Sequence, residues 1–511
     1  TSNYYGVYTA YSYAVTANNI TISGSSSSTV TGWLVYINAL TINSGSTGGD
    51  ILVTATGPTA GGASGISQAG AISGANGSDI SFISNNKISQ SGAITLAANT
   101  AATSSVTYDT TSGSKLSTIS TGSLTLTSGS NQDVNYLVKA SGGAVTIGGA
   151  IGVNGTITLD NTYGCATSGC TPASGYITTS NYATLATTDH AIQTTSGTLT
   201  AVKDITIKGI SYGNYGWYSN QVTSTSTGDV TVTGISYANR GISQTGAITA
   251  TLGDVVLTGQ TTTQYGVYAT GLITANSITV SGTGTGTIAG WITELGAMTI
   301  NAAGGDINIT ATGASAGGSS GINQSGTITL TSGSDITFTS NNVINQTGAI
   351  NLAANVSGST AVVTYDTTSG NRLSTITGGT LTIAASTSTS AINYVMKSSG
   401  SALDPGAVGT SSIRLPGTIT IDNTFGGSPV ATNYLTTSSI TSSNTTTSIG
   451  VTIDNALYAT GNISLKGISY GQMGINYSTI INSSAGDVTL TGITSNYYGV
   501  YTAYSYAVTA N

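Results

Sequence analysis

Residues able to do acid–base chemistry are scarce in this chain. Its single histidine, His190, follows Asp189 in the segment TTDHAIQ, where a carboxylate could orient an imidazole for general-base catalysis. Asp109 and Asp366 recur in two YDTTSG segments, and an aspartate that caps its own turn is the simpler interpretation of both. Only 10 of 511 residues are Lys or Arg, so the clustered acids and bases of a sugar-cleaving site are not expected. The sequence predicts that the protein is not an enzyme.

The two cysteines, Cys165 and Cys170, lie close together in the segment CATSGC. No His or further Cys lies near them in sequence, so a zinc site is not expected. In an oxidising compartment they would form a local disulfide that closes a small loop, and two free thiols are the alternative. Several aspartates follow a glycine at strand starts, but none matches a calcium-binding repeat. No metal or cofactor is expected.

Tyrosine offers the best candidate for a contact surface, because the chain has 28 of them and they recur at related positions. The apolar residue between two tyrosines of a Tyr-Gly-x-Tyr segment is expected to face inward, which leaves the tyrosines at the surface. Such a stripe would suit lateral packing of fibres or stacking on sugars. The alternative is scattered, partly buried tyrosine. The predicted stripe comprises Tyr5, Tyr8, Tyr11, Tyr215, Tyr218, Tyr265, Tyr268, Tyr498 and Tyr501.

A glutamine recurs in five segments that read Ile-[Ser/Asn]-Gln-x-Gly. If the segments stack on one another, these amides could form a hydrogen-bonded ladder along the axis. The alternative is a set of solvent-facing glutamines with no ladder. The residues concerned are Gln68, Gln90, Gln244, Gln324 and Gln346.

Charge is unusually rare. Lys, Arg, Asp and Glu together make up 5% of the chain, against about a quarter in an ordinary soluble domain. A net charge of −7 over 511 residues leaves no basic patch for nucleic acid. No run approaches the eighteen apolar residues that a membrane span needs, so no membrane insertion of this segment is expected.

The chain repeats itself at two scales. Residues 494–511 are identical to residues 1–18, TSNYYGVYTAYSYAVTAN, which predicts a tandem array with a unit of 494 − 1 = 493 residues. Within the unit, VTYDTTSGSKLSTI returns as VTYDTTSGNRLSTI, and GTITLDNTYG returns as GTITIDNTFG. We therefore expect a first half over residues 1–264, a diverged second half over 265–493, and the start of the next repeat at 494–511.

A shorter period of about 22–25 residues runs through both halves, with longer steps where Gly, Ser and Thr are inserted. Segments such as DVTVTG alternate apolar and polar residues, which is typical of strands, and Gly, Asn and Asp end each run after four to six residues. These patterns predict an all-β chain with almost no helix. We expect a right-handed parallel β-helix (a β-solenoid) of roughly twenty coils, in which each coil stacks on the next at ~4.8 Å.

The phrases SGAITLAAN, GGDINITATG and TGSLTLTSG resemble the repeats of filamentous haemagglutinin-type exoproteins. The resemblance implies a large β-helical adhesin, exported by two-partner secretion or an autotransporter-type route to the cell surface of a Gram-negative-type bacterium. It implies the same fold that the periodicity predicts.

Three functions fit these observations. The favoured one is a structural extracellular filament, an adhesin stalk or a component of a biofilm matrix or sheath, whose partner is the next repeat along the axis and, in bundles, a neighbouring rod. The second is a β-helical protein that binds or cleaves carbohydrate, with cell-surface glycans as partners. The third, an ice-binding rod, needs a flat threonine face at constant coil length, and the coil lengths vary.

Overall fold

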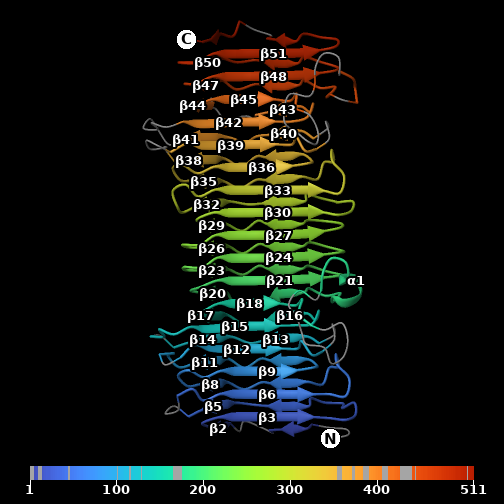
Figure 1. The fold of residues 1–511 in the computed structure, drawn as a ribbon, viewed down its shortest axis with the longest axis vertical. Helices are drawn as coiled ribbons and strands as arrows, with labels where there is room; N and C mark the ends of the chain where they lie inside the picture. The colour runs from blue at the N-terminus through green and yellow to red at the C-terminus, as the bar shows by residue number, and fades with distance from the viewer. Residues whose placement is uncertain are drawn as a thin grey trace. The chain divides into compact units, whose positions relative to one another are not determined.

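One short motif, three strands separated by tight corners, is repeated along the whole chain (Figure 1). The computed structural model describes residues 5–9, 14–43, 47–100, 102–113, 117–127, 129–164, 175, 177–353, 359–370, 374–383, 391–405, 413–425, 435, 440–443, 445–502 and 505–510. The chain divides into two compact units, Thr1–Thr262 and Thr263–Asn511. This division follows contacts, whereas the sequence boundary at residue 264 concerns the duplication and stays a prediction.

Alternating side chains explain why these segments are strands. Strand β24 (Val230–Ser236) reads VTVTGIS, with every second residue buried and those between partly exposed. Val230 and Val232 therefore point inward, and Thr231 and Thr233 point outward. The corresponding residues of neighbouring turns pair in parallel, so that Val stacks on Ile or Val from turn to turn. Each unit is thus a parallel β-helix with a continuous apolar interior.

In the first unit, each turn has a short strand in sheet A, a short strand in sheet B and a longer strand in sheet C. Sheet A contains β1 (Val7–Tyr8), β4 (Val35–Ile37), β7 (Ile66–Gln68), β10 (Ile88–Gln90), β13 (Ile119–Thr121), β16 (Val145–Ile147), β19 (Ile192–Thr194), β22 (Trp217–Ser219) and β25 (Ile242–Gln244). Sheet B contains β2 (Val15–Ala17), β5 (Leu40–Ile42), β8 (Ile72–Gly74), β11 (Ile94–Leu96), β14 (Leu124–Leu126), β17 (Ile151–Val153), β20 (Leu199–Ala201), β23 (Thr223–Thr225) and β26 (Ile248–Ala250). Sheet C contains β3 (Ile20–Ser25), β6 (Ile51–Thr56), β9 (Ile80–Ser84), β12 (Ser104–Asp109), β15 (Val134–Lys139), β18 (Ile157–Asp160), β21 (Ile205–Ser211), β24 and β27 (Val255–Thr261).

The second unit has the same three-strand turn. Sheet A contains β28 (Val267–Ala269), β31 (Thr293–Leu295), β34 (Ile322–Gln324), β37 (Ile344–Gln346), β40 (Ile376–Thr377), β43 (Leu403–Asp404), β46 (Val451–Ile453), β49 (Ile475–Tyr477) and β52 (Val500–Tyr501). The sheet-B position is held by β29 (Ile273–Ala275), β32 (Met298–Ile300), β35 (Ile328–Leu330), β38 (Ile350–Leu352), β41 (Leu381–Ile383), β44 (Ile413–Leu415), β47 (Leu457–Ala459), β50 (Ile481–Ser483) and β53 (Val508–Thr509). Sheet C contains β30 (Ile278–Gly284), β33 (Ile307–Gly313), β36 (Ile336–Ser340), β39 (Ala361–Asp366), β42 (Ile392–Lys397), β45 (Ile419–Asp422), β48 (Ile463–Ser469) and β51 (Val488–Thr494).

The length of a turn varies while the sheets stay in register. Ile205 pairs with Val230 and Val230 with Val255, so the sequence separation is the same at both steps, 230 − 205 = 25 and 255 − 230 = 25. By contrast, Ile157 pairs with Ile205, at a sequence separation of 205 − 157 = 48. The described strands make nine complete turns in the first unit and eight complete turns in the second, 17 in all, and β52 and β53 begin a further turn. The number is lower than expected because many turns are longer than the regular ones around β24. The expected fold is confirmed, and the expected number of about twenty coils is too high.

The longest turns carry their extra residues between β18 and β19 and, in the second unit, between β45 and β46. The described part of the first insertion contains α1 (Tyr182–Leu185), the only helix among the described residues. A small cluster of Ile177, Tyr182, Ala186 and Ile210 packs this insertion onto β21. The strands on either side of each insertion pair in register, β18 with β21 and β45 with β48.

The two copies of the eighteen-residue segment adopt the same strands. Val7–Tyr8 forms β1 and Val500–Tyr501 forms β52, and 500 − 7 = 493. Val15 begins β2 and Val508 begins β53, with the same offset. The identical sequence therefore forms the same part of a turn in each unit.

Candidate functional site

The described tyrosines of the predicted stripe lie at the corner where the chain enters sheet A. Gly6 lets the corner pack closely, since a Cβ there would lie 3.0 Å from the Leu34 carbonyl oxygen. The residue after the glycine faces inward, as Trp217 and Val267 do. The flanking rings lie side by side, with centroid distances of 4.6 Å for Tyr5–Tyr8, 5.4 Å for Tyr215–Tyr218, 5.2 Å for Tyr265–Tyr268 and 5.3 Å for Tyr498–Tyr501. Tyr11 lies outside the described residues.

These rings form separate patches. In the first unit, Tyr36 joins Tyr8 at 5.4 Å and Tyr5 at 5.9 Å. Tyr8 and Tyr36 occupy the outward middle position of sheet A, and the same position becomes aromatic again at Tyr218. The turns between carry Ser67, Ser89, Ser120, Thr146 and Gln193 there. The structure therefore places the rings on one column but interrupts that column with polar side chains.

The richest patch surrounds the single histidine. The His190 ring lies 4.8 Å from the Tyr215 ring and 5.1 Å from the Tyr218 ring, both nearly parallel to it. Arg240 lies over the first of these rings, with its Cζ 5.8 Å from the Tyr215 centroid, and its Nη1 donates to Ser243 Oγ at 3.1 Å. Burial lowers the pKa of His190, although the nearby Asp189 acts in the opposite direction. The imidazole is therefore one more ring of an aromatic stack.

The described contacts give no catalytic dyad. The Asp189 backbone N–H donates to Thr187 Oγ1, and its carbonyl accepts from Ser211 Oγ. Among the described hydrogen bonds none joins the Asp189 carboxylate to His190, so nothing there orients the imidazole as a base. Nor do the described residues bring three His, Cys, Asp or Glu side chains into a metal-binding group. Cys165 and Cys170 lie outside the described residues.

A second aromatic stack was not expected from the sequence. Tyr212 and Tyr237 follow β21 and β24 at the same position, and their rings stack at 5.0 Å. Tyr182 of α1 closes over both, at 6.4 Å and 6.1 Å, and burial raises its pKa. The signal was present in the paired segments GISYGNYG and GISYANRG. In both stacks each ring contacts at least one other ring, although Tyr237 remains 43% exposed.

The five recurrent glutamines are buried, so the solvent-facing alternative is wrong. In each, the side-chain amide donates to the carbonyl of the glycine two residues later, which closes the corner between sheets A and B. A direct amide-to-amide bond of the predicted ladder joins Gln346 to Gln324 at 3.1 Å, whereas Gln68 donates to the Asn38 carbonyl. The described contacts therefore show corner clamps with one rung of a ladder. The clamps are at Gln68, Gln90, Gln244, Gln324 and Gln346.

The glutamine carbonyls also serve buried aromatic side chains. Tyr108 donates its hydroxyl to Gln90 Oε1 at 2.9 Å, Tyr365 does the same to Gln346, and Trp217 Nε1 donates to Gln244. Tyr108 and Tyr365 belong to interior stacks that recur in the two units. These stacks are Phe82–Tyr108–Tyr136, with spacings of 5.2 and 5.7 Å, and Phe338–Tyr365–Tyr394, with spacings of 5.0 and 5.6 Å.

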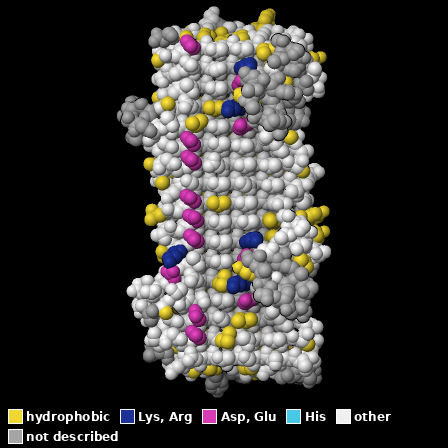
Figure 2. Space-filling model, in the orientation of Figure 1, with side chains coloured by type: hydrophobic (Ala, Val, Ile, Leu, Met, Phe, Trp, Pro, Cys, Tyr) yellow, Lys and Arg dark blue, Asp and Glu magenta, His cyan; other side chains and the backbone are white. Residues whose placement is uncertain are grey.

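Sheet C carries a column of alternating charge in each unit, which sequence reasoning missed. Register places an acid, a lysine, an acid and a lysine opposite one another on four successive turns (Figure 2). The same position carries Thr233 and Thr258 on later turns of the first unit. The charged columns are Asp109, Lys139, Asp160 and Lys208, and Asp366, Lys397, Asp422 and Lys466. Opposite charges on adjacent strands stabilise the stacking of these turns.

The acids of these columns also cap turns. Asp109 Oδ1 accepts the Thr111 backbone N–H at 2.7 Å, as the sequence predicted for an Asx-turn, and Asp366 caps Thr368 in the same way. Asp160, only 6% exposed, accepts both the backbone N–H and the hydroxyl of Thr162 at 2.6 Å. Lys139, which pairs with Asp160, places its Nζ 5.5 Å from the centroid of the Tyr163 ring. These residues therefore have structural partners within the turns that they join.

Two buried asparagines fasten the long insertions. Asn161 Oδ1 accepts the Ile210 N–H at 2.9 Å, and its Nδ2 donates to the Ile210 carbonyl at 3.1 Å. Asn423 makes the same pair of bonds to Ile468, at 2.8 and 3.0 Å. Each asparagine thus joins the end of one long strand to the strand one turn later, at a sequence separation of 49 or 45. The signal was the repeated Asp-Asn-Thr within GTITLDNTYG and GTITIDNTFG.

Aspartates that precede the long strands form a second axial column (Figure 2). Asp204 Oδ1 accepts the Asp229 N–H at 3.0 Å, and Asp229 Oδ1 accepts the Asp254 N–H at 2.8 Å. In the second unit, Asp335 links Asp306 to the Val362 N–H at 2.8 Å. Burial raises the pKa of Asp335, the bond from Val362 opposes this, and the charge of Asp306 adds to it. The column is an axial hydrogen-bond ladder.

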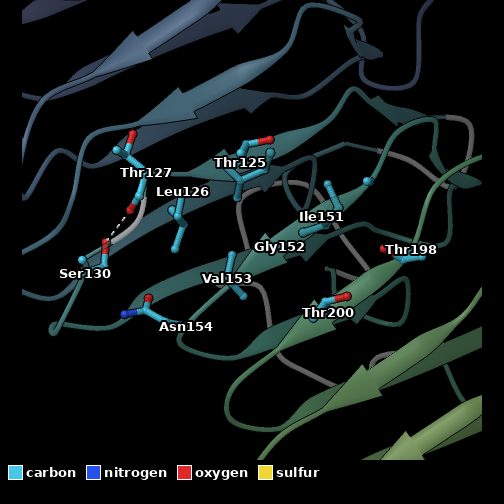
Figure 3. Close-up of a pocket in the computed structure, with 13 residues that line it drawn as sticks. Thr125, Leu126, Thr127, Ser130, Ile151, Gly152, Val153, Asn154, Thr198 and Thr200 are labelled. Carbon is cyan, nitrogen blue, oxygen red and sulfur yellow. Dashed lines mark hydrogen bonds between the residues drawn. The ribbon is translucent and has the colours of Figure 1, made fainter.

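A shallow groove of about 450 Å³ opens over β14, β17 and β20 (Figure 3). Gly152 occupies the outward position that Thr200 holds one turn later, so the missing side chain hollows the surface. β14 pairs with β17 at a single position, Leu124 with Ile151, which widens the groove further. Leu126 and Val153 face it, and its described lining has no titratable side chain. The groove is therefore lined by apolar side chains together with uncharged polar ones such as Thr127 and Asn154.

No helix among the described residues is long and apolar enough to span a membrane. No protein-family model matches the chain, and no curated protein or solved structure matches it at a significant level.

Proposed function

We propose that this protein is a structural rod: a segment of an extracellular filament or adhesin stalk built from tandem 493-residue β-helical repeats, and not an enzyme. The observation that carries the proposal is that residues 1–18 and 494–511, identical in sequence, form equivalent strands of a β-helical turn. Since each turn contacts only its neighbours, a β-helix can be lengthened without a new kind of core.

The contacts of the described side chains support a structural role. The candidate residues from the sequence contact one another or a neighbouring turn. Examples are the Gln244 corner clamp and the stack of His190 on Tyr215. The recurring devices act along the axis: ring stacks, charge columns and the aspartate ladder. Export to the surface of a Gram-negative-type cell rests on the resemblance of the repeat phrases to haemagglutinin-type exoproteins, and lateral bundling of rods through aromatic patches is part of the same proposal.

Electron microscopy of cells that express the full natural chain tests this role. Filaments labelled by an antibody against residues 1–511 are expected, with an axial repeat of about 80 Å if 17 turns continue at ~4.8 Å each. A strain that lacks the chain is the control. Label confined to the cytoplasm, or the absence of filaments from cells that make the chain, would overturn the proposal.

Carbohydrate binding remains the alternative, because exposed rings are present at Tyr497 and Tyr498, 62% and 61% exposed. Stacking on a sugar needs a free ring face. The rings of most described patches cover one another, which favours the structural role. A glycan array probed with the purified chain distinguishes the two, since a binding protein would retain a defined glycan class and a rod would not.

The ice-binding alternative gains one observation. Insertions leave sheet C in register, so outward pairs such as Thr231 with Thr233 and Thr337 with Thr339 remain regularly placed despite unequal turn lengths. The objection that turn length must be constant is therefore wrong. The charged columns interrupt this threonine face, however, and we therefore favour the structural filament over an ice-binding protein. Thermal hysteresis of the purified chain tests it.

A further inference from the structure

The eighteen-residue segment is seen twice, each time with a different neighbour. At residues 1–18 its strands contact the turn that follows: Val7 pairs with Val35 and Val15 with Leu40. At residues 494–511 the same strands contact the turn that precedes: Ile475 pairs with Val500 and Ile481 with Val508. Because the segment is identical in the two places, the two views can be combined into one turn with both neighbours.

We infer that consecutive copies of the unit are joined around this segment: the edge of β51, which precedes it, is covered by β3, which follows it, of a second copy of the unit. The register of this joint places Val488 opposite Ile20, Leu490 opposite Ile22 and Gly492 opposite Gly24. This inference rests on the proposed function and identifies the partner as the next repeat. Residue 20 of that copy corresponds to position 20 + 493 = 513, and 513 − 488 = 25. This is the step already found between Ile463 and Val488.

The side chains of β51 lack the cover that their counterparts have. Ile463 and Leu465 in β48 are fully buried, whereas Val488 and Leu490, which pair with them, are partly exposed. Val500 and Val508 are 38% and 42% exposed, although these positions are core positions in other turns. A further turn in register would bury all four, and β3 offers Ile20 and Ile22 at the matching positions.

Backbone geometry fits the same register. Gly492 of β51 pairs with Gly467 of β48, one turn earlier. Both positions need glycine, because the corner leaves no room for a Cβ there. At Gly24 an added Cβ would lie 2.6 Å from Val35 Cγ2. The position that would pair with Gly492 in the second copy therefore also needs a glycine. A register shifted by one residue would bring a side chain to this column and turn the apolar residues of β51 outward.

The axial ladder of aspartates and asparagines also continues across the joint. Asn462 Oδ1 accepts the Asp487 N–H at 2.9 Å, and Asn19 Oδ1 accepts the Asp50 N–H at 3.0 Å. With Asn19 of the second copy one turn beyond Asp487, the Asp487 carboxylate accepts the Asn19 N–H. The Ile463 N–H donates to the Asp487 carbonyl, so by the same pattern the Val488 N–H donates to the carbonyl of Asn19.

A two-unit chain, residues 1–511 continued by residues 19–511, tests the joint against the single chain. Hydrogen exchange followed by mass spectrometry observes β51 of both copies in the same peptides, because their sequences are identical, so unequal protection appears as two isotopic envelopes. We expect exchange in the first copy to be slower by about 100-fold or more, because only that copy has a following turn. Exchange in β21 and β24, far from the joint in sequence, serves as the folding control.

A matched substitution locates the contact. Leu490→Asp in the first copy is expected to abolish the protection of β51, since a carboxylate would be buried between turns. The same substitution in the last copy is expected to leave the exchange of all other strands unchanged. Equal exchange of β51 in both copies, or equal effects of the two substitutions, would overturn the joint. Filaments on cells could be absent while the joint forms, so its failure and that of the proposed function are distinguishable.

Discussion

Asn161 is a fully buried side chain whose amide satisfies the backbone of Ile210. In Asn161→Ala both the N–H and the carbonyl of Ile210 would lose their partner in the interior. Each unsatisfied buried group costs about 1–3 kcal/mol, so we expect the free energy of unfolding to fall by about 2–4 kcal/mol. Urea unfolding measures it, with Asn423→Ala as the equivalent variant of the second unit. Asn220→Ala, at an exposed position, is the control, and a loss as large as that of Asn161→Ala would contradict the assignment.

Four buried tyrosines make the protein sensitive to alkali. Burial raises the pKa of Tyr108, Tyr136, Tyr365 and Tyr394 above the ordinary value of 10.0. Above pH 10 the unfolded chain releases these protons while the folded chain keeps them, so the free energy of unfolding falls as the pH rises. Absorbance at 295 nm should show this part of the tyrosinate signal appearing only together with loss of the circular dichroism of the strands. Titration of all tyrosines before unfolding would contradict their burial.

Sequence reasoning predicted the turn-capping aspartates, but it missed the corner bonds of the glutamines and the partners that lie one turn away. The turn-capping role of Asp109 depends on a residue two positions later, so the YDTTSG segment sufficed to predict it. The bond from Gln68 to Gly70 is equally local, yet the recurrence of the motif suggested an axial ladder instead. The partner of Asn161, Ile210, lies 49 residues away in the sequence. This pairing could not be predicted, because the length of the inserted turn is not evident from the repeat period.

At the scale of the strand, the aspartate column places like charges one turn apart. Asp335→Asn keeps an oxygen for the Val362 N–H and removes the repulsion from Asp306. Because the carboxyl pKa of Asp335 is raised in the folded chain, the natural protein loses stability as the pH rises through that pKa. The increase in the free energy of unfolding of the variant over the natural protein should therefore be largest at pH 7. We expect a gain of a few tenths to about 1 kcal/mol, which should vanish near pH 3. Asparagine already holds this position at Asn462, and a loss of stability at pH 7 would refute the argument.

The alternating charge column makes a second prediction for the strands. Threonine is a suitable replacement for Lys139 in β15, because Thr233 occupies the same column in a later turn. The substitution Lys139→Thr removes one of the two lysines that lie on the turns next to the buried Asp160. We expect the free energy of unfolding to fall by about 1–3 kcal/mol, less than the ~3–5 kcal/mol typical of a broken, fully buried ion pair. Lys139→Thr with Asp160→Asn, which keeps the cap of Thr162, should recover most of the loss. A double variant no more stable than the single one would contradict the coupling.

Element prediction was accurate where turns are regular and poorer where they are not. Strand β24 pairs with both neighbours at the same sequence separation, so alternation and period together fix both the strands and their register. The turn that ends at Ile205 is nearly twice as long as the one that follows, and a period search cannot tell an inserted loop from an additional turn. The same ambiguity explains the excess in the expected number of coils. It also explains the missed charge columns, whose members are unequally spaced along the sequence.

For the molecule as a whole, the two units repeat each other's structural devices. Each has an interior stack of one phenylalanine and two tyrosines, a charge column of the same order and an asparagine that fastens the insertion. The charge column and the asparagine both join the strands on either side of the longest turn, β18 to β21 and β45 to β48.

Resistance to trypsin follows from this whole-chain arrangement. Of the ten Lys and Arg residues, Lys139, Lys208, Lys397 and Lys466 lie in long strands that are paired on both sides. Trypsin needs a locally unpaired segment, so cleavage after these residues requires an opening of the strands and should track the population of the open form. We expect mass spectrometry to detect no such cleavage over hours at 25 °C and rapid cleavage after heat unfolding. Thr59→Lys, in an exposed loop, is the positive control, because it should be cut in the native state. Native cleavage at the four strand lysines as fast as at residue 59 would show that the stacked turns open freely.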